Sequence, residues 1–173
     1  CGFDAARKLA ILSSIGFRAN VTFDDVLVEG IEKIDKSDIQ YAKDMGYTIK
    51  LLTVALRQEN GIALNVYPAF LPDNHPLSSV KGAYNAIYVT GNIVDDVMFY
   101  GRGAGALPTA SAVMGDVIST AQHILNGSTG TGMIMTDTKR IPFYSSLKLQ
   151  NSYYFRLDVD DVTGVLSQIA AAF

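Results

Sequence analysis

The fold is decided by the stretch 47-YTIKLLTVALRQENGIALNV-66, in which two apolar runs flank an Asn-Gly pair. Both runs are rich in Ile, Leu and Val, which suit a pleated, half-buried strand. Asn60-Gly61 between such runs is the strongest short-range indication of a β-hairpin, because a type I′ turn requires positive φ at both central residues. The stretch therefore predicts two antiparallel strands, Tyr47 to Arg57 and Ile62 to Val66, joined by a tight turn.

Further strands lie on both sides of this hairpin. Val26 to Val28 is a candidate short strand, and Pro68 to Ser79 is expected to be a loop because prolines recur in it. Tyr84 to Thr90 and Val94 to Tyr100 predict a second pair of strands around a Gly-Asn turn.

Apolar residues recur at helical spacing in three segments: Asp4 to Phe17, Ser37 to Met45 and Pro108 to Leu125. Gly16 can end the first helix, and Asp35 or Ser37 can cap the second. Helices beside adjacent hairpins predict an α+β fold with a mostly antiparallel mixed sheet, rather than a doubly wound parallel one.

The chain divides at the composition break Asn126 to Gly132, which reads NGSTGTG. After it, Tyr153 to Val159 alternates as a strand and Val165 to Phe173 is expected to be a helix. We therefore predict a first domain over residues 1–126, a linker over 127–140 and a second, partial unit over 141–173.

Composition excludes several classes of protein. With 49% hydrophobic and 18% charged residues among 173, the chain is not intrinsically disordered, and its mean hydropathy of +0.19 predicts a large core or a buried interface. A net charge of −3 without a basic patch argues against nucleic-acid binding. No apolar stretch is long enough to cross a bilayer. A single cysteine, Cys1, fits a reducing compartment, so we expect a cytoplasmic protein.

Both ends of the chain lie in apolar helical patterns. The sequence has no initiator Met, and it stops at Phe173 inside a run of helical spacing. Natural termini are usually polar and loose. We therefore expect these residues to be part of a larger protein.

Asp4 and Lys8 stand four residues apart at the start of the first predicted helix, so their side chains share one face. Such a pair is commonly a surface ion pair. It can also be a charged lysine poised to give a proton to a developing alkoxide. The spacing leaves both readings open.

Gly101, Gly103 and Gly105 follow a predicted strand and precede a predicted helix. Bare backbone at a helix N-terminus attracts anions and lets a flat ligand approach, although the same glycines can serve a tight turn alone. The spacing is not that of the G-x-G-x-x-G dinucleotide fingerprint. His75 and His123 have no metal ligands at suitable spacing, so no metal site is expected.

Several linked motifs resemble, in order, those of homoserine dehydrogenase. The first is Gly2-Phe-Asp4-Ala-Ala-Arg-Lys8-Leu-Ala-Ile-Leu12. The others are Val28-Glu-Gly-Ile31, Gly46-Tyr-Thr-Ile-Lys-Leu-Leu52, Gly82-Ala-Tyr-Asn-Ala86 and Gly101-Arg-Gly-Ala-Gly-Ala-Leu-Pro-Thr-Ala-Ser111. The resemblance covers roughly residues 2–126, and motifs linked in this way are far more specific than any one alone.

The end of the chain resembles the opening of an ACT domain, a small amino-acid-binding regulatory module. Tyr154-Phe-Arg-Leu-Asp-Val159 would be its first strand. Asp161-Val-Thr-Gly164-Val-Leu166 resembles the D-x-P-G-V-L turn into its first helix, with Thr163 in place of the usual proline. The resemblance implies a partial ACT-like βα unit after the catalytic domain.

The resemblance implies NAD(P)-dependent interconversion of aspartate β-semialdehyde and homoserine, in threonine and methionine biosynthesis. Carried over, Lys8 is the proton donor and Asp4 binds substrate and helps to keep Lys8 protonated. Gly105, with Gly103, lies against NADP or NAD. The family's Rossmann domain would precede Cys1, so we expect the 173 residues alone to be catalytically inactive.

The resemblance also implies a homodimer or homotetramer, formed by pairing sheets, and a threonine effector at the complete ACT domain. The alternative is a non-enzymatic dimerisation and amino-acid-sensing module. A weaker alternative, an anion-binding glycine turn on an α+β scaffold, leaves the Asp4/Lys8 segment unexplained.

Overall fold

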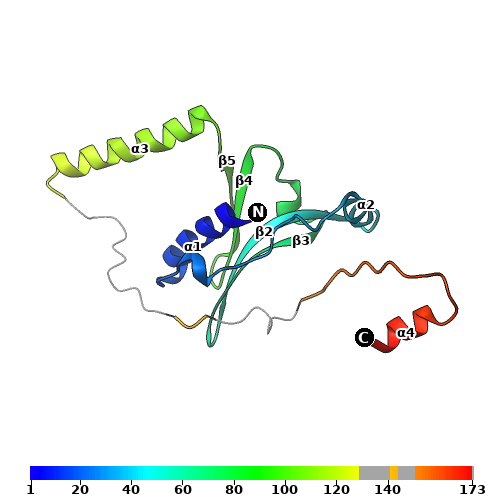
Figure 1. The fold of residues 1–173 in the computed structure, drawn as a ribbon. Coiled ribbons are helices and arrows are strands. Elements are labelled where there is room, and N and C mark those ends of the chain that lie inside the picture. Colours follow the sequence, from blue (N-terminus) through cyan, green and yellow to red (C-terminus); the bar gives the residue numbers. More distant parts are fainter. Residues whose placement is uncertain (129–140, 144–150, 173) are drawn as a thin grey trace.

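The computed structural model describes residues 1–128, 141–143 and 151–172, and Figure 1 shows their arrangement. The helices are α1 (Phe3–Phe17), α2 (Lys36–Asp44), α3 (Ala106–Leu125) and α4 (Val165–Ala172), with short 3₁₀ turns η1 (Phe23–Asp25) and η2 (Pro76–Ser79). The strands are β1 (Leu27–Val28), β2 (Tyr47–Gln58), β3 (Gly61–Pro72), β4 (Tyr84–Gly91) and β5 (Asp95–Arg102).

The long hairpin predicted from the Asn-Gly pair is present as β2 and β3. The strands pair antiparallel from Tyr47 opposite Pro72 to Gln58 opposite Gly61. The two-residue loop is therefore Glu59-Asn60, one position earlier than expected, and neither residue has positive φ, so the turn is not type I′. β3 also continues to Pro72, through the segment expected to be a loop.

The strands form two sheets. In the first, β1 pairs parallel with β3 and β2 pairs antiparallel with it, giving the order β1-β3-β2. The second is the predicted hairpin of β4 and β5, whose loop spans Asn92, Ile93 and Val94. The α+β class and the mostly antiparallel, mixed pairing are confirmed, with the strands divided between two sheets.

One side of α1 packs on the first sheet and makes the core. Ala6 and Ile62 are completely buried, and Val66 is 1% exposed. Buried apolar residues from α1, β3 and the segment between them complete the cluster: Leu9, Ala10, Ala19, Val21, Val26 and Leu64. This packing fixes α1 against β3.

The ends of α1 and α2 follow from local backbone chemistry. α1 ends at Phe17, and it is capped by Arg18, which takes the left-handed conformation with φ 51°, rather than by Gly16. The predicted cap Asp35 starts α2, since its carboxylate accepts the backbone N–H groups of Ser37 and Asp38. Asp38 in turn accepts the N–H of Asp35, which completes a capping box.

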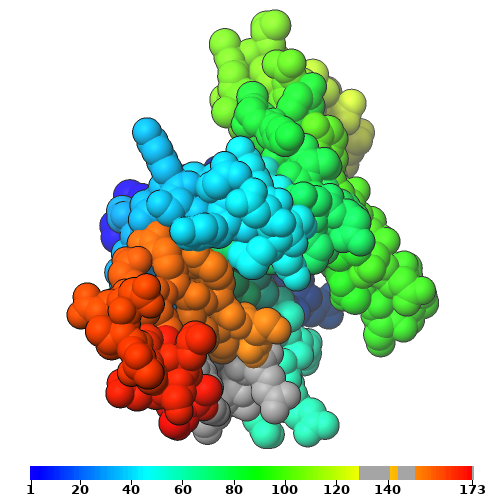
Figure 2. All heavy atoms as spheres, turned by 90° about the vertical axis from the view of Figure 1, so that its right-hand side faces the viewer, coloured from blue at the N-terminus to red at the C-terminus, as the bar shows by residue number. Residues whose placement is uncertain are grey.

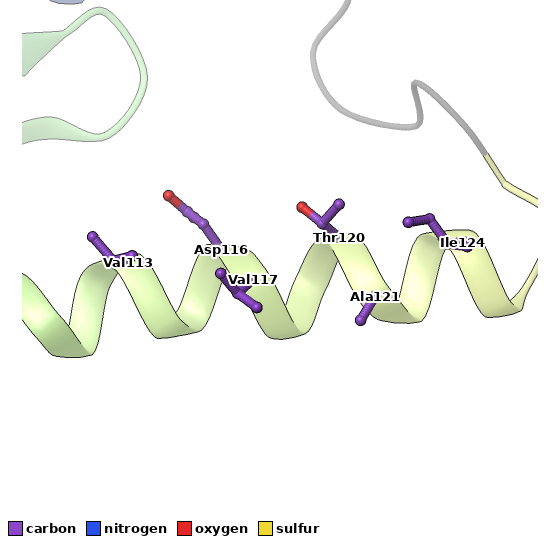
Figure 3. Close-up of a pocket in the computed structure, with 6 residues that line it drawn as sticks. All are labelled: Val113, Asp116, Val117, Thr120, Ala121 and Ile124. Atoms are coloured by element: carbon purple, nitrogen blue, oxygen red, sulfur yellow. The ribbon is translucent and has the colours of Figure 1, made fainter.

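α3 extends away from both sheets in Figure 1, and none of its residues is buried. Figure 3 shows six side chains of this helix that line a shallow pocket along it. They are Val113, Asp116, Val117, Thr120, Ala121 and Ile124. None of the helices in the described part of the chain combines the length and apolar character that crossing a membrane requires.

The end of the chain departs from its predicted strand. Residues 151–162 have no regular secondary structure, so the strand Tyr153 to Val159 is wrong for this chain. A strand needs neighbouring backbone to bond with, and here the side chains of the segment contact α2 and β3 instead. The predicted turn and helix are present, because Gly164 has φ 96° and α4 begins at Val165. Most of the predicted linker, residues 129–140, lies outside the described residues.

Candidate functional site

The predicted pair Asp4 and Lys8 is in contact on the first turns of α1. The Nζ of Lys8 lies 2.8 Å from the Oδ2 of Asp4. Both side chains face solvent, with 66% of Lys8 and 81% of Asp4 exposed. The ammonium is thus oriented by a carboxylate and remains open to a ligand from outside.

Close packing at the start of α1 places this pair. Gly2 precedes the helix and is buried, and a Cβ there would come within 2.8 Å of the Cγ1 of Val66 and 3.0 Å of that of Val28. The helix start therefore approaches the sheet as closely as a glycine allows. Because Ala6 is buried against the core, Asp4 and Lys8 project from the exposed side of the helix.

The glycine turn joins β5 to α3, and it packs against residues at the start of β4. The N–H of Gly103 donates to the carbonyl of Ala83, and a Cβ on Gly103 would come within 2.2 Å of the Asn85 amide nitrogen. Gly105 caps α3 with φ 124°, a conformation that favours glycine. A Cβ at Gly105 would meet only Pro108, at 3.4 Å from its Cδ, so the space where a side chain would stand is otherwise empty.

An aromatic stack beside this turn was not found from the sequence. The rings of Tyr84 and Tyr100 stack with centroids 4.9 Å apart and planes 2° apart. The guanidinium of Arg102 lies over Tyr84, 5.2 Å from its centroid. The pairing of β4 with β5 brings these residues to one end of the hairpin, and only the register predicts that meeting.

His75, which was not expected to bind metal, has a structural role. Its Nδ1 accepts the N–H of Leu77 and starts the turn η2, and its ring lies 5.3 Å from that of Tyr88. The hydrogen bond from Tyr88 to Asp96 raises the pKa of the tyrosine and lowers that of the carboxyl. In the parts of the chain that the structure covers, no three His, Cys, Asp or Glu side chains are placed to hold a metal ion.

A second group missed by the sequence reasoning connects the end of the chain to α2. The Nη1 of Arg156 lies 2.7 Å from carboxylate oxygens of both Asp35 and Asp38, and the hydroxyl of Tyr154 donates to Asp38 over 3.2 Å. These partners are more than a hundred residues apart in sequence, and neither periodicity nor spacing relates them.

Comparison with known proteins places this chain in a family. The family model described as homoserine dehydrogenase matches residues 1–118, which include Asp4, Lys8, Gly103 and Gly105. The chain belongs to the homoserine dehydrogenase family.

Individual relatives agree with this assignment. The homoserine dehydrogenase of Bacillus subtilis is 40% identical over 172 residues, 99% of this chain and 40% of the relative. That of Corynebacterium glutamicum is 41% identical over 177 residues, 99% of this chain and 39% of the relative. The crystal structure of a homoserine dehydrogenase from Thiobacillus denitrificans matches with a TM-score of 0.77 and 37% identity, over 83% of this chain and 34% of that one.

The chain spans about two fifths of the length of the curated homoserine dehydrogenases that it matches. Those matches run through its whole length, including the end after α3, whereas the family model stops at residue 118. They do not favour a separate, non-enzymatic dimerisation and sensing module.

Proposed function

We propose that this chain forms the substrate-binding part of a homoserine dehydrogenase that interconverts aspartate β-semialdehyde and homoserine. The observation that carries the proposal is the exposed Lys8–Asp4 pair, with its 2.8 Å contact, inside the stretch matched by the family model. A charged ammonium with open access on one side is the group that such a reaction requires.

Lys8 supplies the proton that the reaction needs. Reduction of an aldehyde makes an alkoxide, and the Nζ of Lys8 gives its proton to that oxygen; in the reverse direction the amine accepts the proton back. The positive charge also stabilises the developing oxyanion before the proton moves. Asp4 holds the ammonium in one orientation through their ion pair and offers its outer oxygen to the amino or hydroxyl end of the substrate.

The glycine turn fits one face of a nicotinamide cofactor. Gly105 leaves bare backbone at the N-terminus of the 20-residue helix α3, where a flat ring or a phosphate can approach. We propose that Gly105 and Gly103 contact NADP or NAD there. The bound nicotinamide supplies or accepts the hydride.

The chain contains no G-x-G-x-x-G unit, so the adenosine and most phosphate contacts must come from elsewhere. We therefore propose that the 173 residues alone do not turn over the substrate. Turnover by the isolated chain with cofactor and semialdehyde would contradict this.

The decisive experiment compares two lysine variants in the whole polypeptide that the gene encodes. Oxidation of NADPH and NADH is followed with aspartate β-semialdehyde for wild type, Lys8→Ala and Lys43→Ala, the last an exposed lysine on α2. We expect Lys8→Ala to lose about 10²–10⁴-fold in kcat while still folded, because general acid catalysis contributes that much. Lys43→Ala should match wild type.

The outcomes separate the two parts of the proposal. If Lys8→Ala turns over like Lys43→Ala, the proton donor is another group. If wild type itself does not oxidise either cofactor, the proposed reaction is wrong.

We also propose that the protein is a homodimer or homotetramer. Among the described strands, β2 pairs with β3 alone, so its outer edge is open to a second copy. A strictly monomeric mass in light scattering at micromolar concentration would contradict this.

Regulation by threonine would act through a complete ACT domain, and this part of the proposal rests on the resemblance alone.

A further inference from the structure

We propose that Arg156 and Tyr154 form a latch that holds the segment 151–159 on the N-terminal turn of α2. The proposal concerns the attachment of this segment to the rest of the fold, which the proposed dehydrogenase reaction does not involve. It does not depend on the proposed activity.

Bonds within the start of α2 hold the two receiving carboxylates, and none of these bonds involves Arg156. The Oδ1 of Asp35 accepts two backbone N–H groups of α2, and the Oδ2 of Asp38 accepts the N–H of Asp35. These bonds orient both carboxylates and use Asp35 Oδ1 and Asp38 Oδ2, which leaves Asp35 Oδ2 and Asp38 Oδ1 to bind Arg156. Nη1 of Arg156 occupies the position between them, 2.7 Å from each.

Tyr154 supplies a second contact from the same segment. Its hydroxyl shares the Oδ1 of Asp38 with Arg156, and its ring stacks on Phe70 of β3 with centroids 4.6 Å apart and planes 25° apart. The segment is therefore tied to two separate elements, the start of α2 and the second half of β3.

Burial distinguishes this group from an ordinary surface ion pair. The side chain of Asp38 is only 7% exposed, and that of Arg156 is 32% exposed. A carboxylate so removed from water needs a charged partner, whereas an exposed pair contributes little. Figure 2 shows the orange atoms of the C-terminal segment lying directly against the light-blue atoms of the region around α2.

The first test measures how well the segment is protected from a protease. Chymotrypsin cleavage after Phe155, which every variant retains, is timed in the full chain. The rate is divided by that in a free peptide of the same sequence, so that intrinsic cleavability cancels. The variants are Arg156→Gln, Tyr154→Leu and the matched control Arg57→Gln, an exposed arginine at the end of β2.

We expect Arg156→Gln to lower this protection about tenfold, because charge-assisted hydrogen bonds are lost and cleavage follows the open population. Tyr154→Leu should lower it less, and Arg57→Gln should leave it unchanged. Arg156→Gln does not touch the cap bonds of α2, so the helix should retain its circular dichroism. Equal protection in Arg156→Gln and Arg57→Gln overturns the proposal.

A double-variant cycle tests whether the contact itself is responsible. Asp38→Asn alone should lower protection, and its effect should be smaller in the Arg156→Gln background, because the contact between Arg156 and Asp38 is already lost there and only the Tyr154 bond to Asp38 remains. Two losses that simply multiply would mean that the contact between Arg156 and Asp38 does not hold the segment, and would overturn the proposal.

Discussion

Two regions of this molecule use apolar residues in opposite ways. The body, formed by α1 and the β1-β3-β2 sheet, buries residues such as Ala6 and Ile62 completely. The arm, formed by the β4–β5 hairpin and α3, buries none of its residues. Leu107 and Leu125 at the two ends of α3 are 83% and 85% exposed.

Hydrophobic content therefore does not by itself indicate where a core lies. Within the described residues, the arm has the hydrogen bonds of one hairpin and one helix, together with side-chain contacts between paired strands such as the stack of Tyr84 on Tyr100. The body adds side-chain packing between elements that are distant in the chain. Substitutions should therefore affect the two regions very differently.

The largest contrast is expected between Ile62→Ala in the body and Val117→Ala in the arm. Ile62 is 0% exposed, and emptying such a site costs about 2–5 kcal/mol of unfolding free energy. Val117 is 51% exposed, so its truncation should change stability by about 0.5 kcal/mol or less. Urea denaturation of both variants measures this. A large loss in Val117→Ala would show that α3 is packed after all.

An added methyl group should have opposite effects at two glycines. In Gly2→Ala the new Cβ meets Val66 Cγ1 at 2.8 Å, and we expect overpacking to cost about 1–3 kcal/mol. Gly115 of α3 has nothing within 4 Å of such a Cβ, so Gly115→Ala should stabilise the helix by about 0.5–1 kcal/mol. Thermal unfolding and helical circular dichroism report the two effects. Destabilisation by Gly115→Ala would reveal a contact on that face.

The smallest expected contrast is in the loss of stability at low pH, through Asp35 at the start of α2 and Asp96 in the arm. The pKa of Asp35 is lowered by the hydrogen bond from the Asp38 backbone and then by Arg156, and that of Asp96 by Tyr88 and Thr90. A carboxyl whose folded pKa is depressed adds stability above its ordinary value of 3.8, and this stability is lost as pH falls through the folded value. Melting temperatures from pH 7 to 2 should therefore fall less steeply in Asp35→Asn than in wild type.

Asp96→Asn gives the matching measurement in the arm, and its melting curve should also flatten at low pH. A wild-type slope retained in both variants would mean that neither carboxyl contributes to acid unfolding.

Local patterns predicted most of the fold. The runs around Asn60-Gly61 predicted the long hairpin, although the turn shifted by one residue, because Glu59 and Asn60 close it without positive φ. Helical spacing located the three longer helices. The pattern failed at Pro68, which was expected to begin a loop and instead lies inside β3 opposite Leu51. It stands beyond Asn65 and Val66, where β1 pairs with β3, so its missing N–H is not needed on that side. The pattern failed again at Tyr153 to Val159, where alternation alone cannot supply a partner strand.

The candidate site, like the fold, could be predicted from the sequence only where local spacing decides it. Asp4 and Lys8 lie four apart on one helix, so their contact followed from spacing. Their role and that of the glycine turn stay predictions. Arg156 and Asp38 meet only because the chain returns to α2 after more than a hundred residues, and Tyr84 meets Tyr100 only in the observed register.

The parallel pairing of β1 with β3 has a consequence for the order of folding. The β2–β3 and β4–β5 hairpins have loops of two or three residues. Their strands therefore pair rapidly and with little loss of chain entropy. Leu27 instead pairs with Asn65, and α2 and β2 lie between them in the chain. β1 can dock only on a β3 that already exists. The first 28 residues, including the helix that carries Lys8, should therefore join a preformed hairpin late in folding.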